Sequence, residues 1–386
     1  MKMNSPFNHQ SGFGLIEVLV GLLIGLIGII VMFQVLSVSE ARKRSTAGSS
    51  ELQISGSIAM YMLDRDIRAA GYGFANGVDD LNCSVEAYDA GRVPTNFNFR
   101  LVPVLIGQAN GNAGPDTITV LAGNSNTLVS GKEFISSAAN TKTMQAQKRF
   151  GFMRGDLVVA ANDLASPGCA LLEITDNTNA DTVTLNHVDA GSNYISDYAA
   201  DPVPARFNMP GGPAKGFTQG RIYDLGPRPQ LTTWAVLNGA LSYTNAFAAS
   251  AAQTDVGTGV INMKAEYGID SNDNRKLDDN EWTRATPTTT IGWQRLMAIR
   301  IAILVRGDYW DRENCSVAPQ YTSGVSGAIV ATDFVMRNVN GAADSFPACQ
   351  PGVQPVPSAD PNNWRNYRYR VYETIVPLKN MLWGAA

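Results

Sequence analysis

Histidine is almost absent from this sequence, and this scarcity excludes several kinds of chemistry. The 386 residues include two histidines, His9 and His187. We expect the segment that holds His9 to be removed, which leaves His187 alone, so catalytic and metal sites that need paired imidazoles are excluded. The motifs G-x-S-x-G, G-x-x-x-x-G-K-[ST] and H-E-x-x-H, which mark serine hydrolases, P-loop proteins and zinc proteases, are missing as well. We expect no enzyme, and a pair of carboxylates that meets only in the fold is the catalytic alternative left open.

Charged side chains are also scarce. They make up 17% of the chain and leave a formal net charge of -4, against about 25% charged residues in an average soluble domain. Lysine and arginine are scattered, so there is no basic face to neutralise nucleic-acid phosphates. Nucleic acid is excluded as a partner, and the abundance of Gly, Asn, Ala, Ser and Thr favours an exported, turn-rich β protein.

Cysteine is present in a pattern that does not fit zinc or redox sites. Cys83, Cys169, Cys315 and Cys349 lie far apart and form no C-x-x-C motif. In an oxidising compartment such as the periplasm, they predict two structural disulfides, each of which adds about 2 to 4 kcal/mol of stability. We prefer the pair Cys315 and Cys349, because both lie in the C-terminal third of the chain.

One long apolar segment stands near the N-terminus. From Phe13 to Leu36 the sequence holds a single charge, Glu17, and no proline, and about 20 apolar residues suffice for a helix that crosses a membrane. A secretory signal would have a shorter apolar run followed by a small-residue cleavage site. We therefore expect residues 1–12 to be a leader that is removed, and residues 13–36 to remain as a transmembrane helix.

Glu17 interrupts this apolar segment near its start. A carboxylate inside the membrane costs about 2.5 to 3.5 kcal/mol on insertion scales, so it needs a partner. Cleavage after Gly12 would make Phe13 the new N-terminus, and the α-amino group of a neighbouring copy could then neutralise Glu17. The alternative is that Glu17 lies at the headgroup level of an ordinary membrane anchor.

Small residues in the same segment favour close contact between helices. Gly21, Gly25 and Gly28 are spaced so that another helix can approach this side of the segment. Flexibility of the helix in the membrane is the alternative interpretation. Close packing is what the core of a filament requires.

The rest of the chain divides into a stalk and a head. Met60, Leu63, Ile67 and Ala70 recur at helical intervals, which predicts an amphipathic helix within residues 37–74. Short apolar runs separated by turn residues follow, as expected for a large antiparallel, β-rich globular head over residues 75–386. We expect strands near residues 116, 156, 171, 181, 221, 232 and 261, and antiparallel strands at 298–305 and 367–376. The predicted fold class is α+β.

Residues 11–20, SGFGLIEVLV, resemble the class III signal of type IV prepilins. In that family a membrane peptidase cuts after the glycine and methylates the new amine, and it requires Gly12 and Glu17 at this spacing. Three further segments narrow the resemblance to the PilW group of minor pilins. They are DRDIRAAGYGF at 64–74, QRLMAIRIAILVR at 294–306 and YRYRVYETIVPLKNMLW at 367–383.

This resemblance implies a type IV pilin-like fold and a subunit of low abundance. The subunit would pass from the bacterial inner membrane, with its head in the periplasm, into the pilus. Its partners would be the prepilin peptidase, other minor pilins, the major pilin and a tip adhesin of the PilY kind. It would prime assembly near the tip of a filament that serves twitching motility, cell adhesion or DNA uptake. Gln34 stands where major pilins often have a proline, which argues against the bulk subunit.

Two other functions share parts of this pattern. A minor pseudopilin of a type II secretion system would have the same N-terminal signal. A membrane-anchored binding protein or adhesin would use exposed aromatic side chains near the C-terminus, such as Trp364, Tyr367, Tyr369, Tyr372 and Trp383. Alternation of these tyrosines with arginines also fits one face of a sheet.

A polar loop near residue 270 has the spacing of a calcium-binding EF-type loop. Arg275 stands where such loops usually have glycine, and a solvated hairpin rich in turn residues is the alternative. We expect no required cofactor and one structural calcium ion. The candidate ligands are Asp270, Asn272, Asn274, the carbonyl of Lys276, Asp278 and Glu281.

Overall fold

The computed structural model divides the chain into two units, residues 1–51 and 52–386. It describes residues 14–75, 79–109, 114–127, 131–162, 168–176, 178, 181–250, 252–311, 314–325, 327–348 and 360–384. Gly12, Phe13 and Cys349 from the sequence predictions lie outside these residues.

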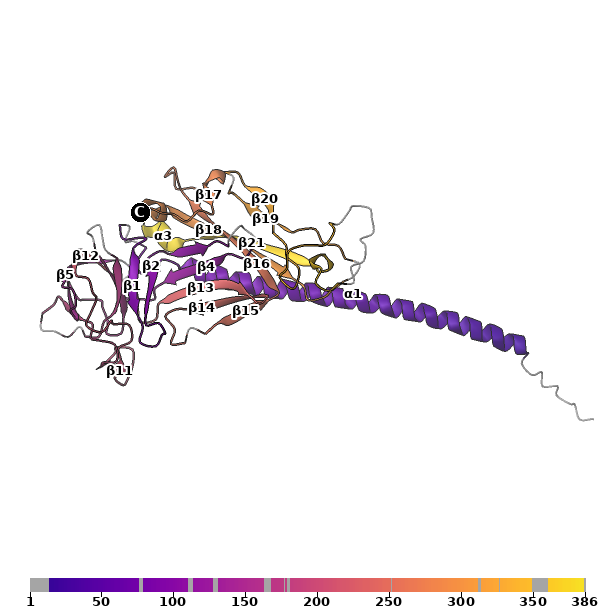
Figure 1. Cartoon of the computed structure of the whole chain (residues 1–386), viewed down its shortest axis with the longest axis horizontal. Helices are drawn as coiled ribbons and strands as arrows, with labels where there is room; N and C mark the ends of the chain where they lie inside the picture. Colours follow the sequence, from indigo (N-terminus) through magenta and orange to yellow (C-terminus); the bar gives the residue numbers. More distant parts are fainter. Residues whose placement is uncertain are drawn as a thin grey trace, which may run out of the picture. The chain divides into compact units, whose positions relative to one another are not determined.

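One long helix, α1 (Leu15–Ala69), runs through the first unit and into the second (Figure 1). Its upper part, from Leu52, packs against the head through a single face. Leu63, Ile67 and Ala70 are fully buried on that face, as the helical spacing predicts. Met60 from the predicted stripe is half-buried, and its neighbour Ala59 is fully buried instead. Gly71 and Gly73 follow with φ of +81° and +92°, a conformation that ends a helix and that glycine adopts without a steric penalty.

Two sheets of the head lie beside the upper part of α1. The five-stranded sheet has the order β15 (Thr254–Thr258), β14 (Ala240–Asn245), β13 (Gln230–Leu237), β4 (Thr117–Ala122) and β3 (Val104–Gly107). The four-stranded sheet has the order β17 (Trp282–Thr283), β16 (Val260–Ile269), β18 (Leu296–Arg306) and β21 (Tyr369–Pro377). All pairings in these two sheets are antiparallel.

An eight-stranded sheet forms the part of the head beyond the end of α1 (Figure 1). Its order is β2 (Asn96–Arg100), β1 (Ser84–Tyr88), β8 (Cys169–Glu173), β7 (Leu157–Asn162), β12 (Phe217–Gly226), β5 (Lys132–Ser137), β6 (Thr143–Ala146) and β9 (Thr184–Asn186). β1 and β8 pair in parallel, which departs from the predicted antiparallel head.

Short elements complete the head. Two hairpins pair β10 (Asn193–Tyr194) with β11 (Val203–Pro204) and β19 (Gln320–Ser323) with β20 (Val330–Asp333). The short helices are α2 (Thr290–Gln294) and α3 (Lys379–Gly384), and the 3-10 turns are η2 (Asp279–Glu281) and η3 (Trp364–Asn366).

The main hydrophobic core lies between α1 and the sheets of the head. β18 is its central strand, because Ile299, Ile301, Ile303 and Val305 alternate along it and all four are fully buried in this core. Two smaller cores lie inside the eight-stranded sheet and on the other face of the four-stranded sheet. The predicted α+β, pilin-like fold class is confirmed, and a strand lies at or next to each predicted strand position.

Candidate functional site

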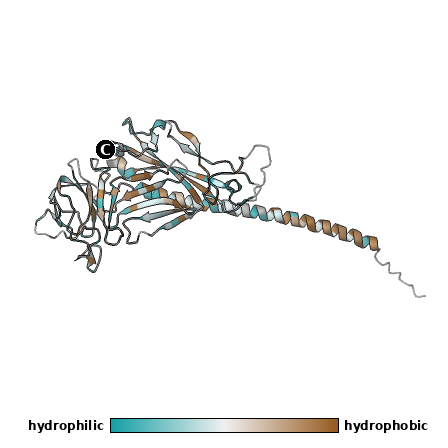
Figure 2. Cartoon of the chain, viewed as in Figure 1, coloured by the Kyte–Doolittle hydropathy of each residue, from teal (hydrophilic) through white to brown (hydrophobic). Residues whose placement is uncertain are grey.

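The lower part of α1 carries apolar side chains that no part of the described chain covers. The stretch Leu15–Glu40 is long and apolar enough to span a membrane, and the hydropathy colouring shows apolar residues along most of it (Figure 2). Leu15 is 80% exposed and Phe33 is 69% exposed. Because exposed apolar surface in water is unfavourable by roughly 25 cal/mol per Å², this stretch requires lipid or other helices around it.

Glu17 lies in the first turn of α1. The backbone N–H of Gly14 donates a hydrogen bond to Glu17 Oε2 at 3.1 Å, so this oxygen satisfies one of the N–H groups that a helix start leaves unpaired. Among the described residues, Glu17 Oε1 has no hydrogen-bond partner. Glu17 is exposed, so this second oxygen is accessible at the surface of the helix.

The three predicted packing glycines lie on the same side of α1 as Glu17. Residues 17, 21, 25 and 28 follow one another at intervals of four, four and three, and residues at such intervals share one helix face. A Cβ atom added at Gly21, Gly25 or Gly28 would meet no atom within 4 Å. Another helix can approach closely along this face of α1. The face ends at Glu17, which presents a carboxylate.

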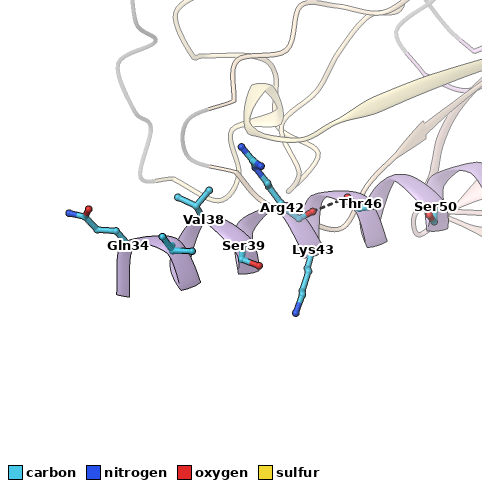
Figure 3. Close-up of a pocket in the computed structure, with 8 residues that line it drawn as sticks. Gln34, Val38, Ser39, Arg42, Lys43, Thr46 and Ser50 are labelled. Atoms are coloured by element: carbon cyan, nitrogen blue, oxygen red, sulfur yellow. Dashed lines mark hydrogen bonds between the residues drawn. The ribbon is translucent and has the colours of Figure 1, made fainter. Parts of the chain in front are cut away.

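Charged residues follow directly after the apolar stretch. Arg42 and Lys43 are exposed and point away from the helix in different directions (Figure 3). Long basic side chains of this kind settle at the level of lipid headgroups. The neighbouring surface hollow in Figure 3 has described lining residues from α1 alone, and we assign no ligand to it.

The segment 64–74, singled out by its sequence, joins the upper end of α1 to two sheets. Gly71 N donates to Leu121 O at 2.9 Å, and Gly123 N donates to Tyr72 O at 2.9 Å. At Gly73 an added Cβ would lie 2.7 Å from the backbone oxygen of Asp224. The motif thus serves attachment of the helix, and glycine is required where the two backbones meet.

The C-terminal segment holds α1 from another side. Tyr372 on β21 donates its hydroxyl hydrogen to Leu52 O at 3.0 Å, and its ring fills the space beside Gly56. Asn380 Nδ2 donates to the carbonyls of Ala69 and Ala70 at 3.2 and 2.9 Å, so it satisfies acceptors at the end of the helix. Sequence periodicity gave no sign of these roles for Tyr372 and Asn380.

The aromatic residues proposed for a binding head are used mainly inside the protein. Trp364 and Tyr367 are buried, Tyr369 donates to Trp364 O at 2.7 Å, and Tyr372 faces α1. The side chain of Trp383 is not among those that the structure describes. These contacts agree with the interpretation of the aromatic residues as part of a sheet.

The described cysteines form disulfide bonds, as the sequence predicts. Cys83 and Cys169 are linked, with Cα atoms 6.0 Å apart, and the bond joins the start of β1 to the start of its parallel neighbour β8. Cys315 is disulfide-bonded too. Cys349, its preferred partner, is outside the described residues.

The proposed calcium ligands lie in one loop whose oxygens now accept backbone hydrogens. Asp270 accepts from Asn274 N at 3.0 Å and from Arg275 N at 2.7 Å. Glu281 reaches across the loop to Ser271 N at 2.7 Å. Arg275 takes the left-handed conformation, with φ of +62°, at the position where EF-type loops have glycine.

The carboxylates of this loop do not converge as an acidic metal cage. Among the residues that the structure describes, no group of three or more His, Cys, Asp or Glu side chains is arranged to hold a metal ion. Calcium binding would therefore need the amide and carbonyl oxygens of Asn272, Asn274 and Lys276 as well. It stays a prediction.

A pair of buried carboxylates in the eight-stranded sheet was not singled out by the sequence. Ser125 Oγ donates to Asp224 Oδ2 at 2.5 Å, and Tyr198 donates to Asp156 Oδ1 at 2.7 Å. Burial, together with the negative charge of Asp156, raises the pKa of Asp224 to about 7. Burial lowers the pKa of His187 to about 4, so this imidazole is neutral at physiological pH.

Two family models match the chain. Type IV Pilus-assembly protein W matches residues 238–380, from the turn after β13 to the start of α3, and the Prokaryotic N-terminal methylation motif matches residues 7–33. No curated protein and no solved structure is similar enough to match the chain. The first match includes Tyr372 and Asn380, which contact the upper part of α1, and the second includes Glu17 and the three glycines. The prepilin motif and the apolar helix indicate a protein that α1 anchors in the membrane before the protein joins the pilus. The chain is therefore a PilW-type pilin, a type IV pilus-assembly component with a prepilin signal.

Proposed function

We propose that this pilin is a minor subunit that takes part in priming pilus assembly together with other minor pilins, near the filament tip. The observation that carries the proposal is the face of α1 on which Glu17 and three glycines lie together on an apolar helix that the head leaves uncovered. This face offers close packing to a neighbouring helix and a carboxylate to its terminal amine.

Processing would supply that amine. The prepilin peptidase would cut after Gly12 and methylate Phe13, and the positively charged amine of an adjoining subunit would then pair with Glu17 Oε1. An ion pair inside a membrane-like environment gains far more than one in water, because the dielectric constant is low. Alignment of each new subunit follows from this pairing, without catalysis by the chain itself.

The head would make the lateral contacts of the subunit. Among the described residues it has a main core and two smaller ones, and at least one disulfide, so it can present a rigid surface to the major pilin, to other minor pilins and to a PilY-type adhesin. A role of the same kind in a type II secretion system is the alternative, since the N-terminal features are shared.

The mass of the mature N-terminus tests the proposal. The full chain is isolated from membranes of cells that contain or lack the prepilin peptidase. We expect a chain that starts at methylated Phe13 only when the peptidase is present. An uncut Met1 in both strains, or a cut after the apolar helix, would overturn the proposal in favour of an anchored or secreted protein of another kind.

A further inference from the structure

The outer edge of β21 is the most extended free sheet edge of the described head. β21 has 9 residues, whereas the other strands at sheet edges have five or fewer. β21 pairs with β18 over its full length without a register shift. Natural proteins usually shorten, bend or charge such an edge, because an open edge recruits another strand.

The register shows which backbone groups face outward. Leu378 N donates to Met297 O at 2.8 Å, so Pro377 and Ala298 form a pair without mutual hydrogen bonds, and such pairs alternate along an antiparallel ladder. Every second residue back from Pro377 therefore directs its N–H and C=O away from β18. These residues are Ile375, Glu373, Val371 and Tyr369.

The edge is accessible at the side chains of two of these residues. Ile375 is 51% exposed. Glu373 is exposed as well, although its Oε1 accepts a hydrogen bond from Thr322 N on β19 at 3.0 Å. Among the described residues, no backbone hydrogen bond reaches the outward groups of β21. Proline, which lacks an N–H, stands at the outward position that ends the strand, so the free edge has a defined end.

β21 also has a fixed direction relative to α1. Its Tyr372 contacts Leu52, and Asn380 just after the strand contacts Ala69 and Ala70. β21 therefore runs in the same direction as the upper part of α1 and lies directly against it.

This direction selects the strand that can pair with the edge. Two copies of the chain paired through antiparallel β21 strands would have their upper helices antiparallel, although both chains enter the pilus from the same membrane. Antiparallel pairing is the more stable kind. We propose that the free edge of β21 receives an antiparallel edge strand from the head of a different pilin subunit, so that one sheet continues across two heads.

This inference rests on the proposed pilin function and adds the contact through which heads recognise one another. The test uses the full chain in piliated cells, with the photoreactive residue p-benzoylphenylalanine at position 375. The matched control carries the same residue at position 195, because Ile195 is 58% exposed and lies outside the four-stranded sheet. We expect an adduct from position 375 that contains a second, prepilin-processed protein linked through a strand of its head, and no such adduct from position 195.

Two substitutions test whether the edge matters for assembly. Ile375→Pro removes one outward N–H without removing a hydrogen bond to β18, and Ile375→Lys adds a charge that opposes pairing. We expect both to reduce the number of pili, whereas Ile195→Lys leaves it unchanged. Formation of the Cys83–Cys169 disulfide in each variant verifies folding.

The outcomes separate the edge contact from the pilin function. An adduct of two copies of this chain, or unchanged pilus numbers in both Ile375 variants, would overturn the proposed contact. Absence of the adduct in cells whose pili still depend on Glu17 would overturn it as well and leave the proposed function intact. Failure of peptidase-dependent processing would overturn the proposed function itself.

Discussion

At the residue scale, the two carboxylate oxygens of Glu17 have different surroundings. One oxygen accepts the N–H of Gly14, the residue just before α1, whereas the other has no partner among the described residues. The first contact stabilises the start of α1 and needs only an acceptor. The contact that we propose between the second oxygen and an incoming amine needs a negative charge, so the two roles are separable by substitution.

We expect Glu17→Ala and Glu17→Gln to impair pilus assembly while both variants still insert into the membrane. A hydrogen bond between charged groups contributes about 1.5 to 3 kcal/mol, so its loss lowers subunit association roughly tenfold to a hundredfold. Counts of pili by electron microscopy and the chain content of membranes measure the two effects. Glutamine keeps an acceptor for Gly14, so normal piliation in Glu17→Gln would show that the charge has no role.

The raised pKa of Asp224 predicts a pH dependence of stability. A carboxyl with an ordinary pKa of 3.8 and a folded-state pKa of about 7 binds more protons in the folded state. The free energy of unfolding therefore falls as pH rises from about 4 to about 7. The ring of His187 acts in the opposite direction between about 4 and 6.5, so comparison of variants is required to isolate Asp224.

Asp224→Asn should remove the part of this decline that Asp224 causes. Asparagine can accept from Gly226 N and donate to Ser125 Oγ, in place of the contacts seen here. With about 1.4 kcal/mol for each unit of pKa shift, the variant gains about 1 to 4 kcal/mol relative to wild type between pH 5 and pH 8. Thermal unfolding of the full chain in detergent at both pH values measures the gain, and an equal pH slope in both proteins would contradict the assignment.

Calcium is predicted to raise the melting temperature of the full chain if the loop at 270–281 binds it. Asp270→Ala removes the first ligand and should abolish the rise. Asp273→Ala is the matched control, because the Asp273 side chain is 71% exposed and occupies a position that supplies no ligand. A melting temperature of the wild type that calcium does not change would leave the loop as a polar turn.

At the element scale, α1 is held by strands from both sides of the head. Gly56 lies against β21, because a Cβ atom added at Gly56 would be 2.1 Å from the Tyr372 ring. Ala59 lies against β15, because its Cβ is 3.1 Å from the place that a Cβ atom would take at Gly257. Small residues on the helix and on β15 allow this close approach. Larger side chains would push the sheets away from the helix.

Gly56→Ala tests the contact between α1 and β21. The new methyl group would displace the Tyr372 ring and break its hydrogen bond to Leu52 O. Overpacking of this kind usually costs about 1 to 3 kcal/mol. We expect a lower melting temperature for Gly56→Ala and little change for Ser57→Ala, since Ser57 is exposed one residue further along; equal stability of the two variants would contradict the contact.

The elements themselves were predictable from the sequence, but the contacts that join them were not. Helical spacing identified the buried face of α1, and alternation identified β18 and β21, because both patterns are local. The bond from Tyr372 to Leu52 joins residues 320 positions apart, and no local pattern encodes it. The cysteines likewise predicted that disulfides form, whereas the pairing of Cys83 with Cys169 depends on the parallel contact of β1 with β8.

At the scale of the whole molecule, the two units of the chain have different surfaces. Every buried hydrophobic residue of the described core lies at Leu52 or beyond, whereas the exposed apolar side chains from Leu15 to Val38 belong to the first unit. The first unit thus depends on lipid or on other subunits, and the second contains its own core. Attachment of the protein to a filament would require the first unit for helix packing and the second unit for contacts of the head.

The fragment Leu52–Ala386 should therefore fold alone when exported to the periplasm. It keeps the buried face of α1, and we expect a soluble protein with the Cys83–Cys169 disulfide and a cooperative thermal transition. A fragment that begins at Ala70 is the control, because it lacks Leu52, Leu63 and Ile67. Each of these buried side chains contributes about 1.5 to 3 kcal/mol, and their sum of roughly 5 to 9 kcal/mol approaches the whole stability of a typical domain. The shorter fragment should aggregate, and equal stability of the two fragments would show that the upper part of α1 is not part of the core of the head.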